Sequence, residues 1–80
     1  MGDLKLYENQ ITGTLQITEN SQYNHVEADN VTLDTNVTAR VYGSVKNIFL
    51  NQGSRLYLHG IISGNVTNLG GEIHVFAPAA

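Results

Sequence analysis

The sequence predicts an all-β fold: a short triangular parallel β-solenoid (β-helix) of about four coils with 17 residues in each. Three observations support this prediction. Strand-favouring Val, Ile, Thr, Leu and Tyr stand between scattered Gly and Asn, while proline occurs once and cysteine is absent. No window keeps apolar residues at helical spacing over two turns. The chain also repeats itself at a length typical of stacked coils.

The repeat is clearest in the second half of the chain. GSVKNIFLNQGSRLYLH, residues 43–59, is followed directly by GIISGNVTNLGGEIHVF, residues 60–76, and the two agree in residue type at almost every position. The same frame moved back by 17 residues fits VEADNVTLDTNVTARVY, residues 26–42. Two columns are then small or apolar throughout: Ala39, Leu56 and Ile73, and Val41, Leu58 and Val75. Because one coil cannot bury its inward face alone, we expect these columns to share one interior.

The first coil is less regular than the others. We expect it to continue two columns of the later coils. One would contain Ile11, Ala28, Val45 and Ile62, and the other Gly13, Asn30, Asn47 and Gly64. After a one-residue deletion the matched pairs are Leu15 with Val31 and Ile17 with Leu33. The coils are therefore expected to cover residues 11–76 of a single domain, residues 1–80.

Gly and Asn mark the corners of the predicted coil, because they enter positive φ at low cost. They recur at three places: Gly13, Asn30, Asn47 and Gly64; Asn36, Gly53 and Gly70; and Gly43 and Gly60. Three corners imply three short sides, which in one coil are residues 44–46, 48–51 and 55–59. Side chains alternate along each side. The expected inward residues are Ile48, Leu50, Leu56 and Leu58, and the expected outward residues are Phe49, Tyr57 and His59.

The two ends of the chain lie outside this frame. Leu4 and Leu6 alternate within residues 1–10, which we expect to form a strand or a cap on the first coil. Pro78 lacks the donor that a strand ladder needs, so residues 77–80 are interpreted as a tail.

The last coil places polar residues at inward positions. Asn65 and Thr67 would lie level with two buried apolar residues, and burial of an unpaired amide costs roughly 1–3 kcal/mol. We expect a local shift that turns Val66 inward, and a polar cap is the alternative. At the outer turn we expect Asp34, Asn51 and Asn68 to form one column whose side chains bond turn backbone.

Charge and motifs argue against several classes of function. The net charge is −3, with four Lys and Arg against seven Asp and Glu, so nucleic-acid binding lacks its main driving force. The sequence contains no long apolar run, so neither membrane insertion nor a signal peptide is predicted, and we expect a cytoplasmic protein. No nucleophile with a base and an orienting group is present, so we expect no enzyme and no cofactor. His25, His59 and His74 lack the converging donors of a metal site.

One outward face of the solenoid is the candidate site for protein interaction. Its two columns are Arg40, Tyr57 and His74, and Tyr42, His59 and Phe76. Tyr and Arg are enriched in interface hot spots, so a flat face of such residues is a plausible docking surface. The alternative interpretation is ordinary stacking along a solenoid face, with Arg40 over Tyr57 as a cation–π contact.

The last two copies resemble the bactofilin-like, polymer-forming β-helix proteins of bacteria. The similar feature is a recurrent phrase of apolar residues with Gly and Asn, here LHGIISGNVTN, residues 58–68. The resemblance implies a right-handed triangular helix that assembles end to end without nucleotide, as a homo-oligomer or a polymer. The sequence therefore favours a structural, self-assembling module. The alternative is a small protein-binding inhibitor, such as a toxin-immunity protein, that uses the candidate face.

Overall fold

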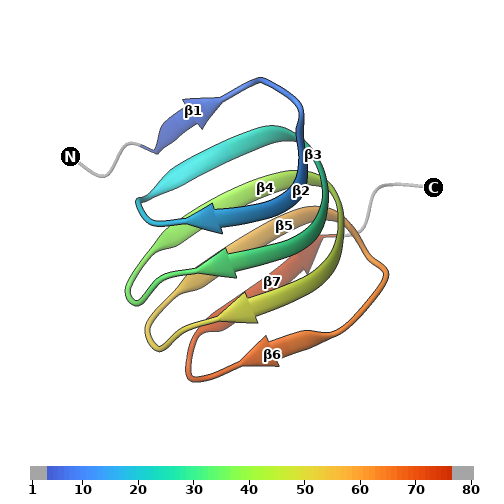
Figure 1. The fold of residues 1–80 in the computed structure, drawn as a ribbon. Helices are drawn as coiled ribbons and strands as arrows, with labels where there is room; N and C mark the ends of the chain where they lie inside the picture. Colours follow the sequence, from blue (N-terminus) through green and yellow to red (C-terminus); the bar gives the residue numbers. More distant parts are fainter. Residues whose placement is uncertain (1–3, 77–80) are drawn as a thin grey trace.

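A computed structural model describes residues 4–76, and these residues form a parallel β-solenoid of about four turns (Figure 1). The strands are β1 (Lys5–Tyr7), β2 (Ile11–Ile17), β3 (Ser21–Leu33), β4 (Thr38–Leu50), β5 (Arg55–Ile62), β6 (Val66–Asn68) and β7 (Glu72–Phe76). Every strand pair is parallel. One side of the stack follows the order β1-β3-β4-β5-β7, while β2 pairs with β3 and β6 with β4 on another side. The predicted all-β solenoid is confirmed.

The 17-residue frame holds in the middle of the stack. Ala39 pairs with Leu56 and Leu56 with Ile73, and Val41, Leu58 and Val75 lie level in the same way. Leu50, Leu56 and Leu58 are fully buried, whereas Phe49, the outward residue before Leu50, is 38% exposed. Identical spacing therefore places apolar side chains on one another in a shared interior, as predicted.

The first coil differs from the predicted alignment. Ile11 pairs with Val26 rather than Ala28, and Gly13 pairs with Ala28 rather than Asn30. The register then shifts between Gly13 and Thr14, after which Leu15 and Ile17 lie beside Val31 and Leu33 as expected. The two alignments of Ile11 differ by two residues, and a two-residue offset leaves every side chain on the same face. Alternation alone could not distinguish between them.

Only two of the three predicted corner columns have positive φ throughout. Asn36, Gly53 and Gly70 have φ values of 61°, 77° and 122°, and Gly43 and Gly60 also have positive φ. At Gly43 (φ 140°) an added Cβ would collide with the carbonyl oxygen of Val26 one coil away, so two requirements select glycine there.

The third predicted corner column is wrong for three of its four members. Gly13 has a φ of 78°, but Asn30, Asn47 and Gly64 do not have positive φ. Asn30 and Asn47 instead lie inside the continuous strands β3 and β4. The Asn47 side chain bonds both neighbouring coils: its Nδ2 donates to Asn30 Oδ1 (3.3 Å), and its Oδ1 accepts from the backbone N–H of Asn65 (3.1 Å). Hydrogen bonding between coils explains these asparagines.

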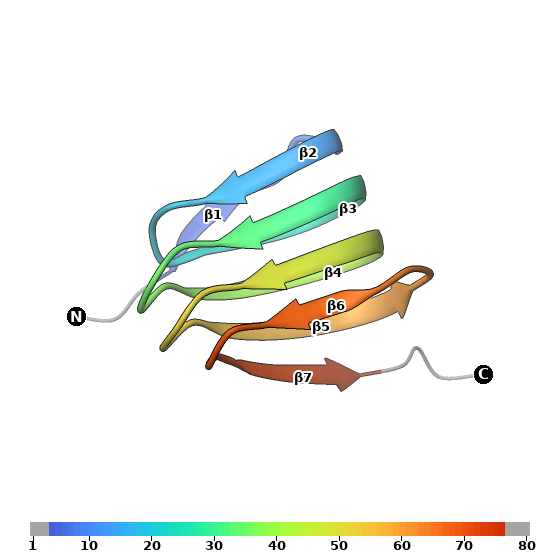
Figure 2. The ribbon, with the colours of Figure 1, turned by 60° about the horizontal axis from the view of Figure 1, so that its bottom comes forward.

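The last coil contains the predicted shift. Val66 pairs with Ile48, one residue later than the 17-residue frame, so Val66 takes the inward register position. The frame is restored where Arg55 pairs with Glu72. Figure 2 shows β6 and β7 as the last strands of the stack.

The same shift removes Asn68 from the predicted outer column, whereas Asp34 and Asn51 stay level, directly after the pair Leu33 and Leu50. Asn68 pairs with Leu50, and Leu69 takes the place level with Asn51. Both asparagines still bond backbone groups. Asn51 Nδ2 donates to the carbonyl of Leu33 (2.8 Å), and Asn68 accepts from the amides of Gly70 and Gly71 at 2.9 and 2.7 Å.

The N-terminal strand completes the first coil. β1 pairs with the start of β3, so the strand expected within residues 1–10 is confirmed for Lys5–Tyr7. Tyr7 stacks on Tyr23 with ring centroids 4.7 Å apart. Residues 1–3 and the predicted tail, residues 77–80, lie outside the described part of the chain. Within residues 4–76, no helix could span a membrane.

Candidate functional site

The six residues of the predicted interaction face lie together on β4, β5 and β7. The register places Arg40, Tyr57 and His74 in one column and Tyr42, His59 and Phe76 in the next. Because the two columns are two residues apart along each strand, both point to the same side of the sheet. We call these six residues the ring face. The predicted grouping is confirmed, while its role as an interaction site stays a prediction.

The rings of the ring face stack from coil to coil. Tyr42 and His59 have centroids 4.5 Å apart with an interplanar angle of 12°. The values are 4.6 Å and 15° for His59 and Phe76, and 5.1 Å and 10° for Tyr57 and His74. These spacings are close to the ~4.8 Å between neighbouring strands, so each ring lies almost directly over the next.

Arg40 does not take part in the expected cation–π contact with Tyr57. Among residues 4–76 the cation–π contact is between Lys5 and Tyr7, with Nζ 5.4 Å from the ring centroid. Arg40 is exposed. That part of the stacking interpretation is therefore wrong, and the guanidinium remains available to another group.

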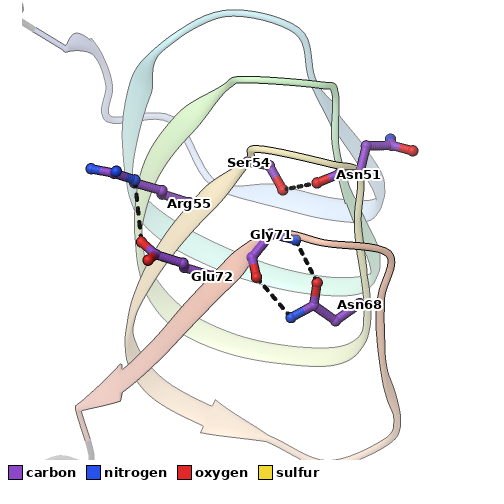
Figure 3. Close-up of polar contacts among 6 residues, drawn as sticks. All are labelled: Asn51, Ser54, Arg55, Asn68, Gly71 and Glu72. Carbon is purple, nitrogen blue, oxygen red and sulfur yellow. Dashed lines mark hydrogen bonds and ion pairs between the residues drawn. The ribbon is translucent and has the colours of Figure 1, made fainter.

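An ion pair and a hydrogen-bonded turn, both drawn in Figure 3, precede the ring-face residues along the chain. Arg55 Nε lies 3.2 Å from a carboxylate oxygen of Glu72, and both side chains are 58% exposed. An exposed pair of this kind contributes only ~0–1 kcal/mol. In the turn before it, the fully buried Ser54 donates from Oγ to the carbonyl of Asn51 at 2.7 Å. The turn thus fixes where β5 begins, and with it the position of Tyr57.

A shallow hollow of about 430 Å³ lies beside Tyr42. It forms where β3 has two residues, Asn24 and His25, opposite the single Tyr42, because the register shifts between Tyr23 and Val26. Its lining consists of Gln10, Asn24, His25, Val26, Glu27, Tyr42, Gly43 and Ser44. Sequence reasoning missed this hollow. The signal for it was the 18-residue spacing from Tyr23 to Val41, which the 17-residue frame concealed.

The histidines do not gather into a metal site. Within residues 4–76 no group of three or more His, Cys, Asp or Glu residues could hold a metal ion. His59 and His74 belong to different columns of the ring face, and His25 lines the hollow beside Tyr42.

Two ionisable groups with shifted pKa values, Tyr23 and Lys5, lie at the N-terminal end of the solenoid. Burial raises the pKa of Tyr23, against a smaller opposing effect of the hydrogen bond with Ser21. The neighbouring Tyr7 hydroxyl raises the pKa of Lys5. These residues belong to β1 and to the start of β3, where Tyr7 stacks on Tyr23.

The C-terminal end of the solenoid leaves its interior columns uncovered. Val75 is 50% exposed although Leu58, one coil earlier in the same column, is fully buried. Val66 is 41% exposed while Ile48, its neighbour in another inward column, is 2% exposed. Leu69 in the adjoining turn is 56% exposed. We call Val66, Leu69 and Val75 the open end.

At the N-terminal end of the stack, in contrast, the apolar interior is buried. Leu15 is 8% exposed and Ile17 is fully buried, although both lie in the first coil. The two ends therefore differ, and the described part of the chain shows an apolar interior accessible at the C-terminal end.

Comparison with known proteins gave no match to a family model, to a curated protein or to a solved structure. The resemblance to bactofilin-like proteins thus stays a prediction from the sequence.

Proposed function

We propose that this protein is a non-enzymatic structural module that associates with itself through the open end, as bactofilin-like proteins assemble through coil ends. The observation that supports this proposal is the change within one column, from a fully buried Leu58 to a half-exposed Val75. A fifth coil would cover Val75 as β7 covers Leu58. A second copy is a natural source of such a coil, because solenoid coils are completed by their neighbours.

Strand pairing would add to the free energy of association that comes from burying apolar side chains. Within the described chain β7 pairs with β5 alone and β6 with β4 alone, so both strands have an unpaired edge. An unpaired edge is a template for another chain. Covering a half-exposed valine is worth about 1 kcal/mol, half of the ~1.5–3 kcal/mol for complete burial. Several such side chains and two strand edges together favour association.

The test replaces one residue of the open end with lysine. Wild-type protein should show a mass that rises with concentration in analytical ultracentrifugation between about 5 μM and 1 mM, the range over which association worth ~4–7 kcal/mol becomes visible. Val75→Lys should stay monomeric because the partner coil would bury a charge. Ile61→Lys is the matched control, since Ile61 is similarly exposed, at 56% against 50% for Val75, but lies on an outward side of the stack.

Two results would contradict the proposal. One is a wild-type protein that stays monomeric across the whole range. The other is an equal loss of association in the Ile61→Lys control. Far-ultraviolet circular dichroism of both variants establishes that they are folded. The proposal also includes a cytoplasmic location, which cell fractionation tests.

A second candidate function is a protein-binding inhibitor, such as a toxin-immunity protein. The observation that favours it is the ring face itself, where five aromatic and imidazole rings and one arginine are fixed on three paired strands. If a toxin domain co-purifies with this protein, Tyr57→Ala and Tyr42→Ala should then release it. Unchanged co-purification of that domain would remove this candidate.

A further inference from the structure

His59, the middle residue of one column of the ring face, offers its ring edge rather than an open ring face to a partner. His59 has one flat face against Tyr42 and the other against Phe76, at 4.5 and 4.6 Å. The stack follows the direction from coil to coil, so the edges and polar tips of the rings point away from the sheet. Aromatic edges are the electropositive part of the ring, and Tyr O–H and His N–H groups donate hydrogen bonds. A sugar or base, which stacks on an open ring face, therefore finds none at His59, whereas Tyr57 and His74 stack only on each other.

The charged residues of the chain are divided along the solenoid. Six of the seven acidic residues precede position 35, and three of the four basic residues follow it. The strands that form the ring face contain a single carboxylate, Glu72, which is paired with Arg55. Within residues 4–76 no carboxylate lies at ion-pair distance from Arg40. The ring face therefore combines one unpaired guanidinium with two tyrosine hydroxyls and two imidazoles, which can also donate hydrogen bonds, on a protein of net charge −3.

We infer that the ring face is a docking surface for an acidic, carboxylate-rich segment of another protein. One carboxylate of such a segment accepts hydrogen bonds from the Arg40 guanidinium. The next carboxylates along the segment accept hydrogen bonds from the Tyr57 hydroxyl and from the His74 imidazole, which follow Arg40 in the column. The column rises by one strand spacing, ~4.8 Å, at each coil. An extended segment that runs along the column thus meets one donor per coil.

The same charges argue against a nucleic acid or a lipid surface as the partner. Binding of a phosphate backbone draws its strength from several cations at once. The ring face has one unpaired arginine, and the acidic coils of the N-terminal half lie beside it in the stack. A carboxylate segment needs fewer cations, because neutral O–H and N–H donors also satisfy its oxygens.

The inference is independent of self-association. The ring face lies along the side of the solenoid, and the open end lies at its tip. Val75→Ser, which removes an apolar contact of the open end without adding a charge between His74 and Phe76, is therefore a suitable background for the test. The association measurement and the binding measurement described next both use the full 80-residue chain.

The test uses a deca-glutamate peptide as the probe. It is titrated into ¹⁵N-labelled protein at low salt, and backbone amide shifts are followed by nuclear magnetic resonance. We expect saturable shifts at Arg40, Tyr57 and His74 that weaken as salt is raised. Arg40→Gln should lower the affinity about fivefold, the upper range for an exposed ion pair. Lys46→Gln is the matched control, because Lys46 is also an exposed cation of β4 but lies beyond the bend at Gly43.

Three results would overturn the inference. The first is a set of shifts that does not include the ring face. The second is an equal loss of affinity in Arg40→Gln and Lys46→Gln, which would indicate unspecific attraction. The third is equal binding of a deca-thymidylate at the same residues, which would indicate a general polyanion surface. Shifts confined to the ring face, lost with Arg40 and absent for deca-thymidylate, would support it.

Discussion

Two residues of one interior column should differ sharply in their contribution to stability. Leu58 and Val75 are neighbours in the same column, but Leu58 is fully buried between two coils and Val75 is half exposed at the last one. Leu58→Ala removes buried methyl groups and leaves a cavity, which costs ~2–5 kcal/mol. Val75→Ala removes less and leaves an open site, so its cost should be below about 1 kcal/mol.

The first of these losses is large for a chain of this size. At ~0.05–0.15 kcal/mol per residue, 80 residues give a free energy of unfolding of roughly 4–12 kcal/mol. With central values of about 3.5 and 8 kcal/mol, Leu58→Ala should therefore remove roughly two fifths of the total. Urea unfolding at 25 °C, followed by circular dichroism at low micromolar concentration, measures both variants without association. Equal costs at the two positions, or a cost below about 1 kcal/mol for Leu58→Ala, would refute the stacked column.

Two further predictions concern a corner and an ionisable group. Gly43→Ala should destabilise the fold by more than Gly13→Ala, because a Cβ at Gly43 meets the Val26 carbonyl whereas at Gly13 nothing lies within 4 Å. Both glycines have positive φ, so the two substitutions share that cost. Comparable urea midpoints for the two variants would therefore contradict the close contact at Gly43. Burial raises the pKa of Tyr23 above its ordinary value of 10.0, so the stability it contributes is complete below pH 10 and is lost as pH rises through the raised pKa. Tyr23→Phe should flatten this alkaline loss, while Tyr57→Phe should leave it; identical profiles would refute the assignment.

The sequence predicts the middle of the solenoid well for a physical reason. From Val26 onward each coil buries its side chains against the next, so like residue types recur at a fixed spacing. Where the coil gains or loses a residue, this signal weakens. At Ile11 an offset of two residues keeps the same face inward, and the alternation remains satisfied by the wrong alignment.

The shift in the last coil was predictable because the unshifted frame buries Asn65 and Thr67, which is costly without partners. Its effect on the outer column was not, since Asn68 bonds its own turn in the observed register and would satisfy an outer position equally well. Asn30 and Asn47 illustrate the same ambiguity. Asparagine favours both positive φ and side-chain ladders, and the composition does not distinguish between them.

The candidate site, like the fold, was predictable from the sequence only in part. Alternation along β4, β5 and β7 predicted which six residues form the ring face. Ring stacking and the freedom of Arg40 depend on rotamers, which the sequence does not specify. The difference between the two ends was not predictable, because the sequence does not show that the N-terminal coil is covered while the C-terminal coil is exposed.

The most direct test of the stacked coils is a set of distances between methyl groups. In protein with labelled Leu and Val methyls, nuclear Overhauser effects should connect Leu58 to Val41 on one side and to Val75 on the other, because the register places Leu58 between them. The absence of both contacts under conditions where other methyl contacts are seen would contradict the solenoid and, with it, both proposed surfaces.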